Sequence, residues 1–574
     1  MKKYILFNIR KHNRQMKSKL QLLMLVVTLA IFSGCKSDYL DKYPLSGPSD
    51  DSFFTNQDEL VLAVNGIYRY ANYTPLDNMP LNLLTDNASD IGWDRNNSAL
   101  QAIGKGNHDS TNGFALSIWT EAYKVIAKCN FILDNIDKVK DKTTPAIFNR
   151  SRAEARFVRA YTYHYLVDNF GDVPLITKVL TLEEMKVPKN PKTEVVDFIL
   201  KELTEAATDL EVNYTGANVG RATRGAALAI KARTALYNQR WAVAAEAAKA
   251  VMDLNVYNLH PNFGTLFGYA GQNSNEIIWA FQYLKASRTK THSTPNNLVS
   301  RNGLGFTNKV PSQSLVDVYL CTDGLNIDES PLFDPAKPYL NRDPRLTFTI
   351  AVPGSIYYNY QFETHRDSVK CWNYNTTPAT RVDNQDALNA FATFTGYCWK
   401  KYVDLEDRLD RTNSELNIIQ IRYAEVLLIY AEAKNELQQL DQTAYDAINR
   451  VRTRPSVNMP AITPGKTEAE FRSLVRKERL YELAMEGFRL SDLRRWKIAE
   501  KAMNGNFYGR VQRGLVAAAP QIDENGLTDY TLVPNRADMR VVEVRTFNKD
   551  RDYLWPIPNI ETVTNPLLKP NPNY

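Results

Sequence analysis

The sequence predicts a mainly α-helical protein built from stacked helix pairs, with one long loop-rich insertion. Apolar residues recur at three- and four-residue spacing in segments spread between residues 50 and 497, which predicts helices. Two of these segments are rich in alanine and contain a short break, which predicts helix pairs. Residues 256–410 instead are rich in Gly, Pro, Asn and aromatic residues, which predicts the insertion.

The bulk composition agrees with a large folded body. The chain has 574 residues, 44% hydrophobic and 23% charged, and compact cores seldom exceed about 300 residues. The length therefore favours two domains, or a stacked-helix body carrying insertions. Residues 1–34 hold seven positive charges and no acid, so the net charge of +6 becomes −1 without them. A chain near neutrality has no global field for nucleic acid, and we expect no nucleic-acid partner.

Residues 1–34 have the pattern of a lipoprotein signal peptide. Basic residues precede an apolar stretch at 20–32, which is too short to span a bilayer, since a span needs about 20 residues. Small residues then lead to Cys35, so we expect cleavage before Cys35 and lipid attachment to its thiol. Residues 35–48 then form the lipidated tether, and residues 49–574 form one body. The alternatives are a start at Met16 and a soluble secreted protein with a chance cysteine.

The first predicted helices lie at residues 57–70 and 118–139, each with an apolar stripe. The clearest pattern follows at residues 154–176, where Phe157, Tyr161 and Tyr165 lie four apart. An aromatic stripe this wide needs helices on more than one side. Gly171 and Pro174 predict where this helix ends.

Helix pairs are predicted at residues 221–254 and 421–454. Small residues at helix crossings let two backbones approach closely, as in tetratricopeptide units, although generic helical hairpins have the same spacing. Residues 468–497 are predicted to be helical again, and the C-terminal residues 553–574 are punctuated by prolines and predicted to be extended. Within these patterned segments the tryptophans are expected in the core: Trp119, Trp241, Trp279 and Trp555.

Several of these stretches resemble the SusD/RagB family of outer-membrane nutrient-binding lipoproteins. The most specific is Phe170-Gly171-Asp172-Val173-Pro174. The others are Asp38-Tyr39-Leu40 with Pro44, Ala63 to Tyr68, Trp119 with Tyr123, Ile126 and Asn130, Ile421 to Ala433, Glu478 to Arg489, and Leu554 to Pro558 with Asn565-Pro566.

The resemblance implies an α-helical superhelix of tetratricopeptide-like pairs with a looped face. It implies a surface-exposed lipoprotein of the outer membrane, partnered with a SusC-like TonB-dependent transporter over which it closes as a lid. It further implies capture of oligosaccharides, glycans or peptides without chemistry, and no cofactor. Family ligand contacts vary, so none transfers to this sequence by motif.

Three groups of titratable residues invite other interpretations. Glu478, Glu482 and Glu486 lie four apart, as paired carboxylates of a glycoside hydrolase could, but neighbouring arginines favour ion pairs. The carboxylates Asp86, Asp90 and Asp94 could bind Ca²⁺, although their spacing fits no EF-hand and a solvated loop is favoured, so no metal site is predicted. His164 and Cys129 lie in helical patterns and are expected in the core. A disulfide between Cys371 and Cys398 is compatible with an exported protein, but the sequence does not establish it.

Three groups in polar loops could bind a sugar. A sugar ring stacks its apolar face on an aromatic side chain, and its hydroxyls need amide, carboxylate or guanidinium partners. Alternatively these aromatics plug the body. The candidates are Trp93 with Asp94, Arg95 and Asn96; Tyr283 with His292, Asn296, Asn297 and Arg301; and Trp372 with Tyr374.

The sequence thus favours a cell-surface lipoprotein that binds a glycan and delivers it to a transporter. The other hypotheses are a peptide-capturing homologue, a surface glycosidase and a cytoplasmic helical-repeat adaptor.

Overall fold

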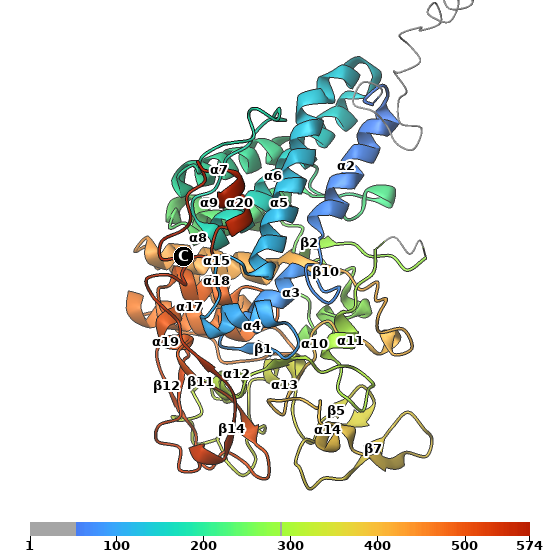
Figure 1. Ribbon diagram of the computed structural model, residues 1–574. Coiled ribbons are helices and arrows are strands. Elements are labelled where there is room, and N and C mark those ends of the chain that lie inside the picture. The colour runs from blue at the N-terminus through green and yellow to red at the C-terminus, as the bar shows by residue number, and fades with distance from the viewer. Residues whose placement is uncertain (1–52, 287–289) are drawn as a thin grey trace, which may run out of the picture.

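The structure is a computed structural model that describes residues 53–286 and 290–574. Long helices occupy one end of the molecule, and short strands and loops occupy the other (Figure 1). This confirms a mainly α-helical fold. The long helices are α2 (Gln57–Ala71), α5 (Gly113–Asn135), α6 (Pro145–Phe170), α7 (Lys192–Asp209), α8 (Arg224–Tyr237), α9 (Trp241–Asp253), α15 (Tyr423–Glu436), α16 (Gln442–Arg452) and α17 (Glu468–Leu483).

These helices stack in a continuous series. Helices α2 and α5 pack on α6, α6 packs on α7, α7 on α8 and α8 on α9. Helix α9 then contacts α15, which packs on α16 and α17. The two alanine-rich pairs, far apart in sequence, are therefore neighbours in one stack, because small residues let their backbones approach.

Helix α6 is the central member of the stack. It begins at Pro145, earlier than the apolar pattern indicated, because Thr144 caps its first turn by accepting from the backbone N–H of Ile147. Phe157 and Tyr161 pack edge-on against Trp279 at 4.9 and 5.0 Å. The helix ends at Gly171, whose φ of 74° confirms the predicted end.

The prediction of one helix over residues 468–497 is wrong. Helix α17 ends at Leu483, and α18 (Arg489–Arg495) begins after a non-helical turn. The cause is Asp86, whose carboxylate accepts hydrogen bonds from the backbone N–H groups of Glu486, Gly487 and Arg489 at 3.0–3.1 Å. Gly487 and Arg489 bond a side chain from residue 86 instead of helical carbonyls, and the N–H of Glu486 is shared between Asp86 and the carbonyl of Leu483 at 3.1 Å.

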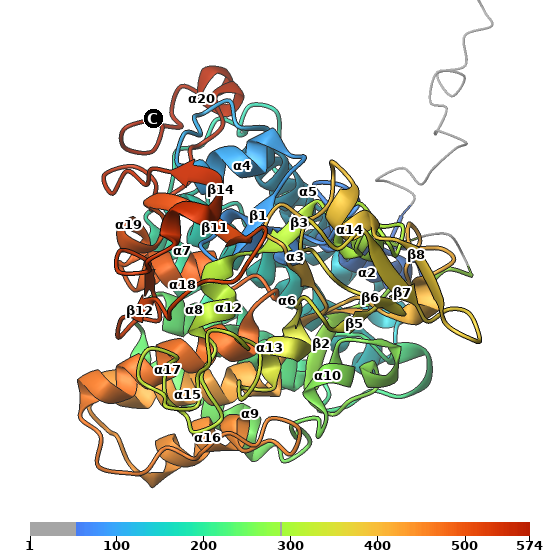
Figure 2. The same cartoon turned by 90° about the horizontal axis from the view of Figure 1, so that it is seen from below.

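The remaining elements are short and lie mainly on the loop-rich side (Figure 2). The short helices are α3 (Leu81–Thr85), α4 (Ser98–Lys105), α10 (Phe263–Leu266), α11 (Thr294–Leu298), α12 (Gln313–Val318), α13 (Arg345–Thr349), α14 (Gln385–Leu388), α19 (Ala499–Ala502) and α20 (Asn559–Thr564). The strand pairs are β1 (Gly92–Asp94) with β3 (Lys309–Pro311), β2 (Ile277–Phe281) with β10 (Ile418–Arg422), β4 (Ile350–Ala351) with β9 (Cys398–Trp399), β11 (Gly505–Val511) with β14 (Met539–Arg545), and β12 (Gln521–Ile522) with β13 (Thr528–Asp529). A four-stranded antiparallel sheet contains β5 (Ile356–Tyr357), β6 (Tyr360–Gln361), β7 (Lys370–Asn373) and β8 (Thr380–Asp383).

The C-terminal segment closes against the helical stack. The buried Trp555 lies edge-on to Phe114 and Phe170 at 5.7 and 5.8 Å, which confirms the core position predicted for this indole. The segment is not extended throughout, since Asn559–Thr564 forms α20 after Pro558. Trp119 and Trp279 are also buried, whereas Trp241 is half-buried at the start of α9.

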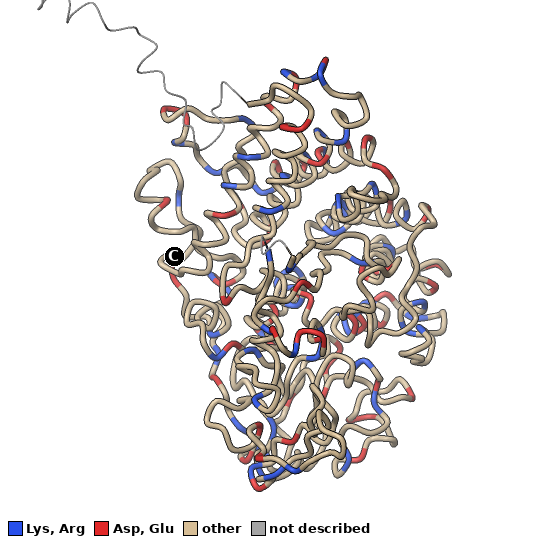
Figure 3. Tube along the Cα trace, turned by 90° about the vertical axis from the view of Figure 1, so that its right-hand side faces the viewer, with Lys and Arg blue, Asp and Glu red and all other residues tan. Residues whose placement is uncertain are grey.

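The described cysteines are all free and buried, so Cys371 and Cys398 do not form a disulfide. Cys129 and His164 are core residues, as predicted. Lys and Arg are interspersed with Asp and Glu along the trace (Figure 3). Within residues 53–286 and 290–574, none of the helices combines the length and apolar character that a bilayer span requires.

Candidate functional site

The loop between α11 and β3 presents two large apolar side chains to solvent. Leu304 is 70% exposed and Phe306 is 47% exposed. Two non-glycine residues of this loop have positive φ, Leu304 at 64° and the β-branched Thr307 at 49°. Backbone of this kind is strained and persists only where its surroundings enforce it. Here the hydroxyl of Thr307 donates to the carbonyl of Val299 at 2.9 Å, which helps to hold Phe306 outward.

Arg95 joins this loop to a second exposed aromatic residue. Its guanidinium donates to the carbonyl oxygen of Phe306 at 3.0 Å and to that of Phe391 at 2.5 Å. It also lies 5.3 Å from the ring centroid of Phe391, which is 59% exposed. One arginine therefore fixes two solvent-facing aromatic residues from segments that are far apart in the chain.

Polar groups surround these aromatic side chains. Asn96 is exposed, and Arg301 is half-buried and donates to the carbonyl of Gly305 at 2.9 Å. Burial and the neighbouring charge of Arg301 both lower the pKa of Arg95, and the two guanidinium groups bond the carbonyls of the adjacent residues Gly305 and Phe306. We call this surface the aromatic face; it comprises Arg95, Asn96, Arg301, Leu304, Phe306 and Phe391.

The structure does not present the rest of the first candidate group. Trp93 is only 7% exposed, because it packs against Phe394 at 5.3 Å and donates its indole N–H to Glu543 at 3.0 Å. Asp94 is buried and pairs with Lys309 at 3.1 Å. The expectation of a Trp93 stacking platform is corrected: Trp93 is a packing residue, and it supports the aromatic face from behind.

The second candidate group is buried except for Arg301. The hydroxyl of Tyr283 donates to Asn72 at 2.7 Å, and Nε2 of His292 lies 2.8 Å from the carbonyl of Leu416. Burial lowers the pKa of His292 to about 4, so this ring is neutral. Asn296 and Asn297 accept through their backbone carbonyls from the N–H groups of Phe306 and Asn308 at 2.7 and 3.1 Å, so they shape the strained loop from inside.

The third candidate pair is exposed on the four-stranded sheet. Trp372 and Tyr374 are 40% and 41% exposed, and Arg381 lies over the Trp372 ring at 5.1 Å. The sheet adjoins the aromatic face, because Asn302, next to Arg301, donates to the sulfur of Cys371 at 3.3 Å. These two aromatics form a second stacking surface beside the first.

The sequence analysis did not select Leu304, Phe306 or Phe391. A signal was present for Phe306, which follows two closely spaced glycines in an otherwise polar segment. Phe391 carried no comparable signal. Phe391 joins the aromatic face through its contact with Arg95, which lies 296 residues earlier in the chain.

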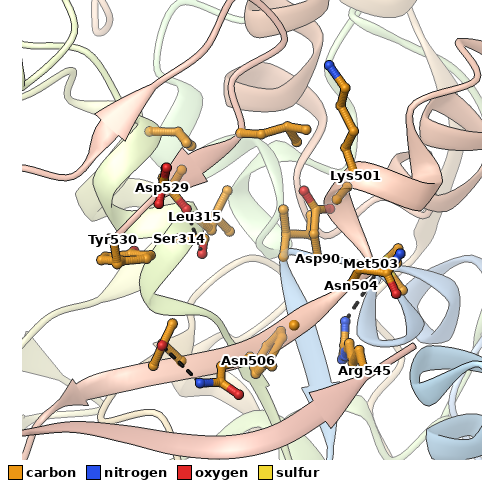
Figure 4. A pocket seen from close by; sticks show the side chains of 18 of the residues that line it. Asp90, Ser314, Leu315, Lys501, Met503, Asn504, Asn506, Asp529, Tyr530 and Arg545 are labelled. Atoms are coloured by element: carbon orange, nitrogen blue, oxygen red, sulfur yellow. Dashed lines mark hydrogen bonds between the residues drawn. The ribbon is translucent and has the colours of Figure 1, made fainter. Parts of the chain in front are cut away.

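Two larger cavities lie elsewhere. One of about 430 Å³ is lined mainly by α12, α19, β11 and β13, with Asp90, Asn506 and Asp529 among its side chains (Figure 4). Its Asp90 is engaged by Arg489 at 2.7 Å. The other, of about 550 Å³, follows β2, and eight of its 21 lining residues are Asn or Gln. Both volumes fall within the range of about 300–1,000 Å³ that is usual for ligand sites.

The glutamate ladder is part of the protein interior. Glu478, Glu482 and Glu486 are 3% exposed or less, and none lies in an open cleft facing a second carboxylate across it. This confirms that the glutamates form ion pairs, but their partners are not the neighbouring arginines that the sequence suggested, since Arg479, Arg489 and Arg495 pair with other acids. The partners of the three glutamates are Arg345, Lys401, Arg422, Arg452 and Arg454.

The prediction of a solvated loop around Asp86, Asp90 and Asp94 is wrong. Asp86 is buried beneath the turn between α17 and α18, and burial raises its pKa to about 6. Asp90 pairs with Arg489 and Asp94 with Lys309, so the three carboxylates point to three different partners. Among the described residues, no group of three or more His, Cys, Asp or Glu side chains is arranged to hold a metal ion.

Comparison with known proteins identifies the fold family. A sequence model of the SusD family matches residues 275–574, and a model described as "Starch-binding associating with outer membrane" matches residues 38–236. SusD-like protein P2 of Formosa agariphila is 26% identical, over 97% of this chain and all of that protein. The starch-binding protein SusD of Bacteroides thetaiotaomicron is 34% identical over 26% of this chain and 27% of that protein.

A solved structure extends the similarity to three dimensions. The SusD-like carbohydrate-binding protein of Bacteroides fragilis superimposes with a TM-score of 0.77 and 31% identity, covering 90% of this chain and 99% of that protein. The stacked helices and the looped face therefore follow a known architecture. With a family match over more than half of its length, the chain belongs to the SusD family.

Proposed function

We propose that the protein captures a glycan at the outer membrane, without chemistry, and passes it to a SusC-like TonB-dependent transporter. Membership of the SusD family supports this proposal. Relatives are named as carbohydrate-binding or starch-binding proteins, and one matching family description mentions association with the outer membrane. Cys35, the proposed lipid anchor, lies outside the described residues.

One observation carries the assignment to the aromatic face. Phe306 and Phe391 are exposed and held by the same guanidinium. Phe306 lies in a loop with strained backbone, and Phe391 is held by Arg95; large apolar side chains held outward have no role in the core, and sugar rings stack on such surfaces. Arg95, Asn96 and Arg301 supply the donors and acceptors that ring hydroxyls need. A passive site of this kind needs no general acid or base.

A binding experiment tests the proposal. The mature chain is titrated against a panel of plant, algal and bacterial polysaccharides by affinity electrophoresis and calorimetry. We expect Phe306→Ala and Phe391→Ala each to weaken binding about tenfold, since each removes a stacking surface. Tyr70→Ala is the matched control, because Tyr70 is 43% exposed on α2, outside the aromatic face.

Three results would overturn the proposal or its location. Binding of peptides with no glycan bound would make the protein a peptide-capturing relative. Release of shorter oligosaccharides on incubation would make it an enzyme. Loss of binding in Trp372→Ala with no loss in Phe306→Ala would move the site to the four-stranded sheet.

A further inference from the structure

The aromatic face continues into a row of arginines without carboxylate partners. The first two are Arg301 and Arg95, whose guanidinium groups bond the carbonyls of the adjacent residues Gly305 and Phe306, and the charge of Arg301 lowers the pKa of Arg95. Each guanidinium has five N–H donors, and the acceptors that it bonds are neutral. Arg301 donates to the carbonyl of Gly305, and Arg95 donates to two backbone carbonyls and to the side chain of Asn96. No ion pair to either is found in the part of the chain that the structure describes.

Two further arginines extend the row past Phe394. The guanidinium of Arg95 lies 5.8 Å from the Phe394 centroid, and that of Arg540, on β14, lies 4.1 Å from the same centroid. Arg540 makes no hydrogen bond or ion pair with its side chain among residues 53–286 and 290–574, and burial and nearby Arg366 lower its pKa. Arg366 donates to the carbonyl of Ala387 at 2.9 Å. We call Arg301, Arg95, Arg540 and Arg366 the arginine row.

A small notch lies at the far end of the row. Its volume is about 20 Å³, and Arg366, Arg540, Phe394 and Arg510 are among its lining residues; Arg510 pairs with Glu363 at 3.6 Å. This is room for one small polar group. Asp386 is the carboxylate that lines the notch, but it is buried and accepts from the backbone and side chain of Asn302 at 3.1 and 3.0 Å.

The arginine row contrasts with the arginines of the interior. Arg422 contacts Glu276, Glu482 and Glu486 at 2.7 Å each. Near the row, Asp94 pairs with Lys309 and Asp367 with Arg513, and neither forms an ion pair with a row arginine among the described residues; the charge of Asp94 only partly offsets the burial and the Arg301 charge that lower the pKa of Arg95. Adjacent like charges destabilise one another, and a partly buried guanidinium without a counterion is costly. An anionic group on the ligand would relieve both costs through charge-assisted, bidentate bonds.

We propose that the glycan bound at the aromatic face is anionic, with its carboxylate or sulfate groups held by the arginine row while its sugar rings stack on Phe306 and Phe391. This proposal rests on the proposed function and specifies its ligand class. A carboxylate presents two oxygen acceptors in a plane, and a sulfate ester presents three terminal oxygens. A guanidinium can donate two parallel N–H bonds to either group. The row therefore selects for charge, and the aromatic side chains select for the sugar ring.

Two pairs of probes that differ only in charge test the proposal. Dextran sulfate is compared with dextran, and polygalacturonate with its full methyl ester, using the mature protein at several salt concentrations. We expect the charged member of at least one pair to bind at least about tenfold more tightly, and the advantage to shrink as salt screens the charges. The pair that shows the advantage tells which anion is preferred.

Single substitutions assign the effect to the row. Arg366→Gln and Arg540→Gln, which lie in the row but outside the aromatic face, are each expected to weaken binding of the charged probe about tenfold and to leave the neutral probe unchanged. Arg69→Gln is the control. Arg69 is an exposed arginine in the last turn of α2, so this substitution removes the same charge at a site outside the row. Equal melting temperatures for all variants exclude an effect through folding.

The outcomes separate the two proposals. Equal affinity for charged and neutral probes, with loss of both in Phe306→Ala, would overturn the anionic ligand and keep glycan capture. An equal loss in Arg69→Gln and in the row variants would reduce the charge effect to nonspecific attraction and would also overturn it. Failure of the protein to bind any glycan would overturn both.

Discussion

At the scale of single residues, burial decides which polar and aromatic side chains can meet a ligand. Trp93 and Phe306 are both aromatic residues in polar loops, yet the first is covered by Phe394 and the second is held outward by strained backbone. His292 and Tyr283 similarly have the composition of a sugar site but bond to protein groups. Exposed residues with enforced geometry are therefore the better candidates.

The buried His292 predicts a pH effect on stability. Its pKa is lowered by burial to about 4, against 6.5 in the unfolded chain, so the unfolded chain binds a proton that the folded protein excludes. The neutral His292 makes its full contribution to the free energy of unfolding above pH 6.5. As the pH falls toward 4, that free energy decreases by up to about 3 kcal/mol. We expect the stability advantage of the wild type over His292→Asn to shrink in this range, measured by urea unfolding. Parallel pH profiles of the two proteins would contradict this.

At the scale of elements, buried charges and helix ends fix how segments meet. Helix α17 carries Glu478 and Glu482 into the interior, where they join α13, β10 and the segment after α16 through arginines. Burial alone would raise the pKa of Glu482, but Arg454, Arg422 and Arg345 lower it well below its usual value. Breaking such a network leaves charges uncompensated in the interior.

Replacement of Glu482 tests this network. Glu482→Gln is expected to lower the free energy of unfolding by about 3–5 kcal/mol, because three arginines lose a shared partner. As a control, Glu246→Gln on α9 removes an exposed charge, and we expect it to change the free energy of unfolding by less than about 0.5 kcal/mol. Chemical denaturation monitored by circular dichroism measures both. A small effect for Glu482→Gln would mean that the network adds little stability.

The end of α6 gives a second prediction at this scale. Gly171 has φ 74° and ψ −116°, and a Cβ atom there would lie 2.9 Å from Cδ1 of Leu554. Gly354 also has positive φ, at 87°, but a Cβ atom there would meet nothing within 4 Å. Gly354→Ala should cost about 1–2 kcal/mol from backbone strain, and Gly171→Ala should cost more because Leu554 must move. Thermal unfolding compares them, and equal losses would rule out the contact with Leu554.

At the scale of the whole molecule, a rigid helical stack supports a looped face. The stack runs from α2 to α17, and the C-terminal segment is locked onto it by Trp555. The aromatic face and the arginine row are assembled from loops that this frame holds in place, together with β14. Such a division places binding groups on loops while the scaffold fixes their geometry.

Anchoring is predicted to act on the whole molecule without changing the site. If Cys35 carries the proposed acyl chains, Cys35→Ser should move the protein from the membrane fraction to the soluble fraction of the cell, because the attachment is lost. Ser37→Ala is the neighbouring control. Cell fractionation with immunoblotting measures the distribution, and the glycan affinity of the purified mature body should stay the same. Retention of Cys35→Ser in the membrane would show that another contact holds the protein there.

The sequence by itself determined the helical stack, the end of α6 and the family. Those features depend on local spacing, capping and turn residues, and on motifs that survive at moderate identity. The local sequence pattern did not predict the break between α17 and α18, because there the distant carboxylate of Asp86 accepts hydrogen bonds from the backbone N–H groups. It failed equally for the loop around Asp86, which its polar composition placed in solvent.

Only the tertiary structure decided which loop aromatics are exposed and which arginines lack acidic partners. Both properties depend on contacts between residues that are hundreds of positions apart, such as Arg95 with Phe391 and Trp93 with Glu543. Composition gives the residue types of a binding surface, but burial and ion pairing are set by the neighbours that folding supplies. The aromatic face and the arginine row therefore became visible only in three dimensions.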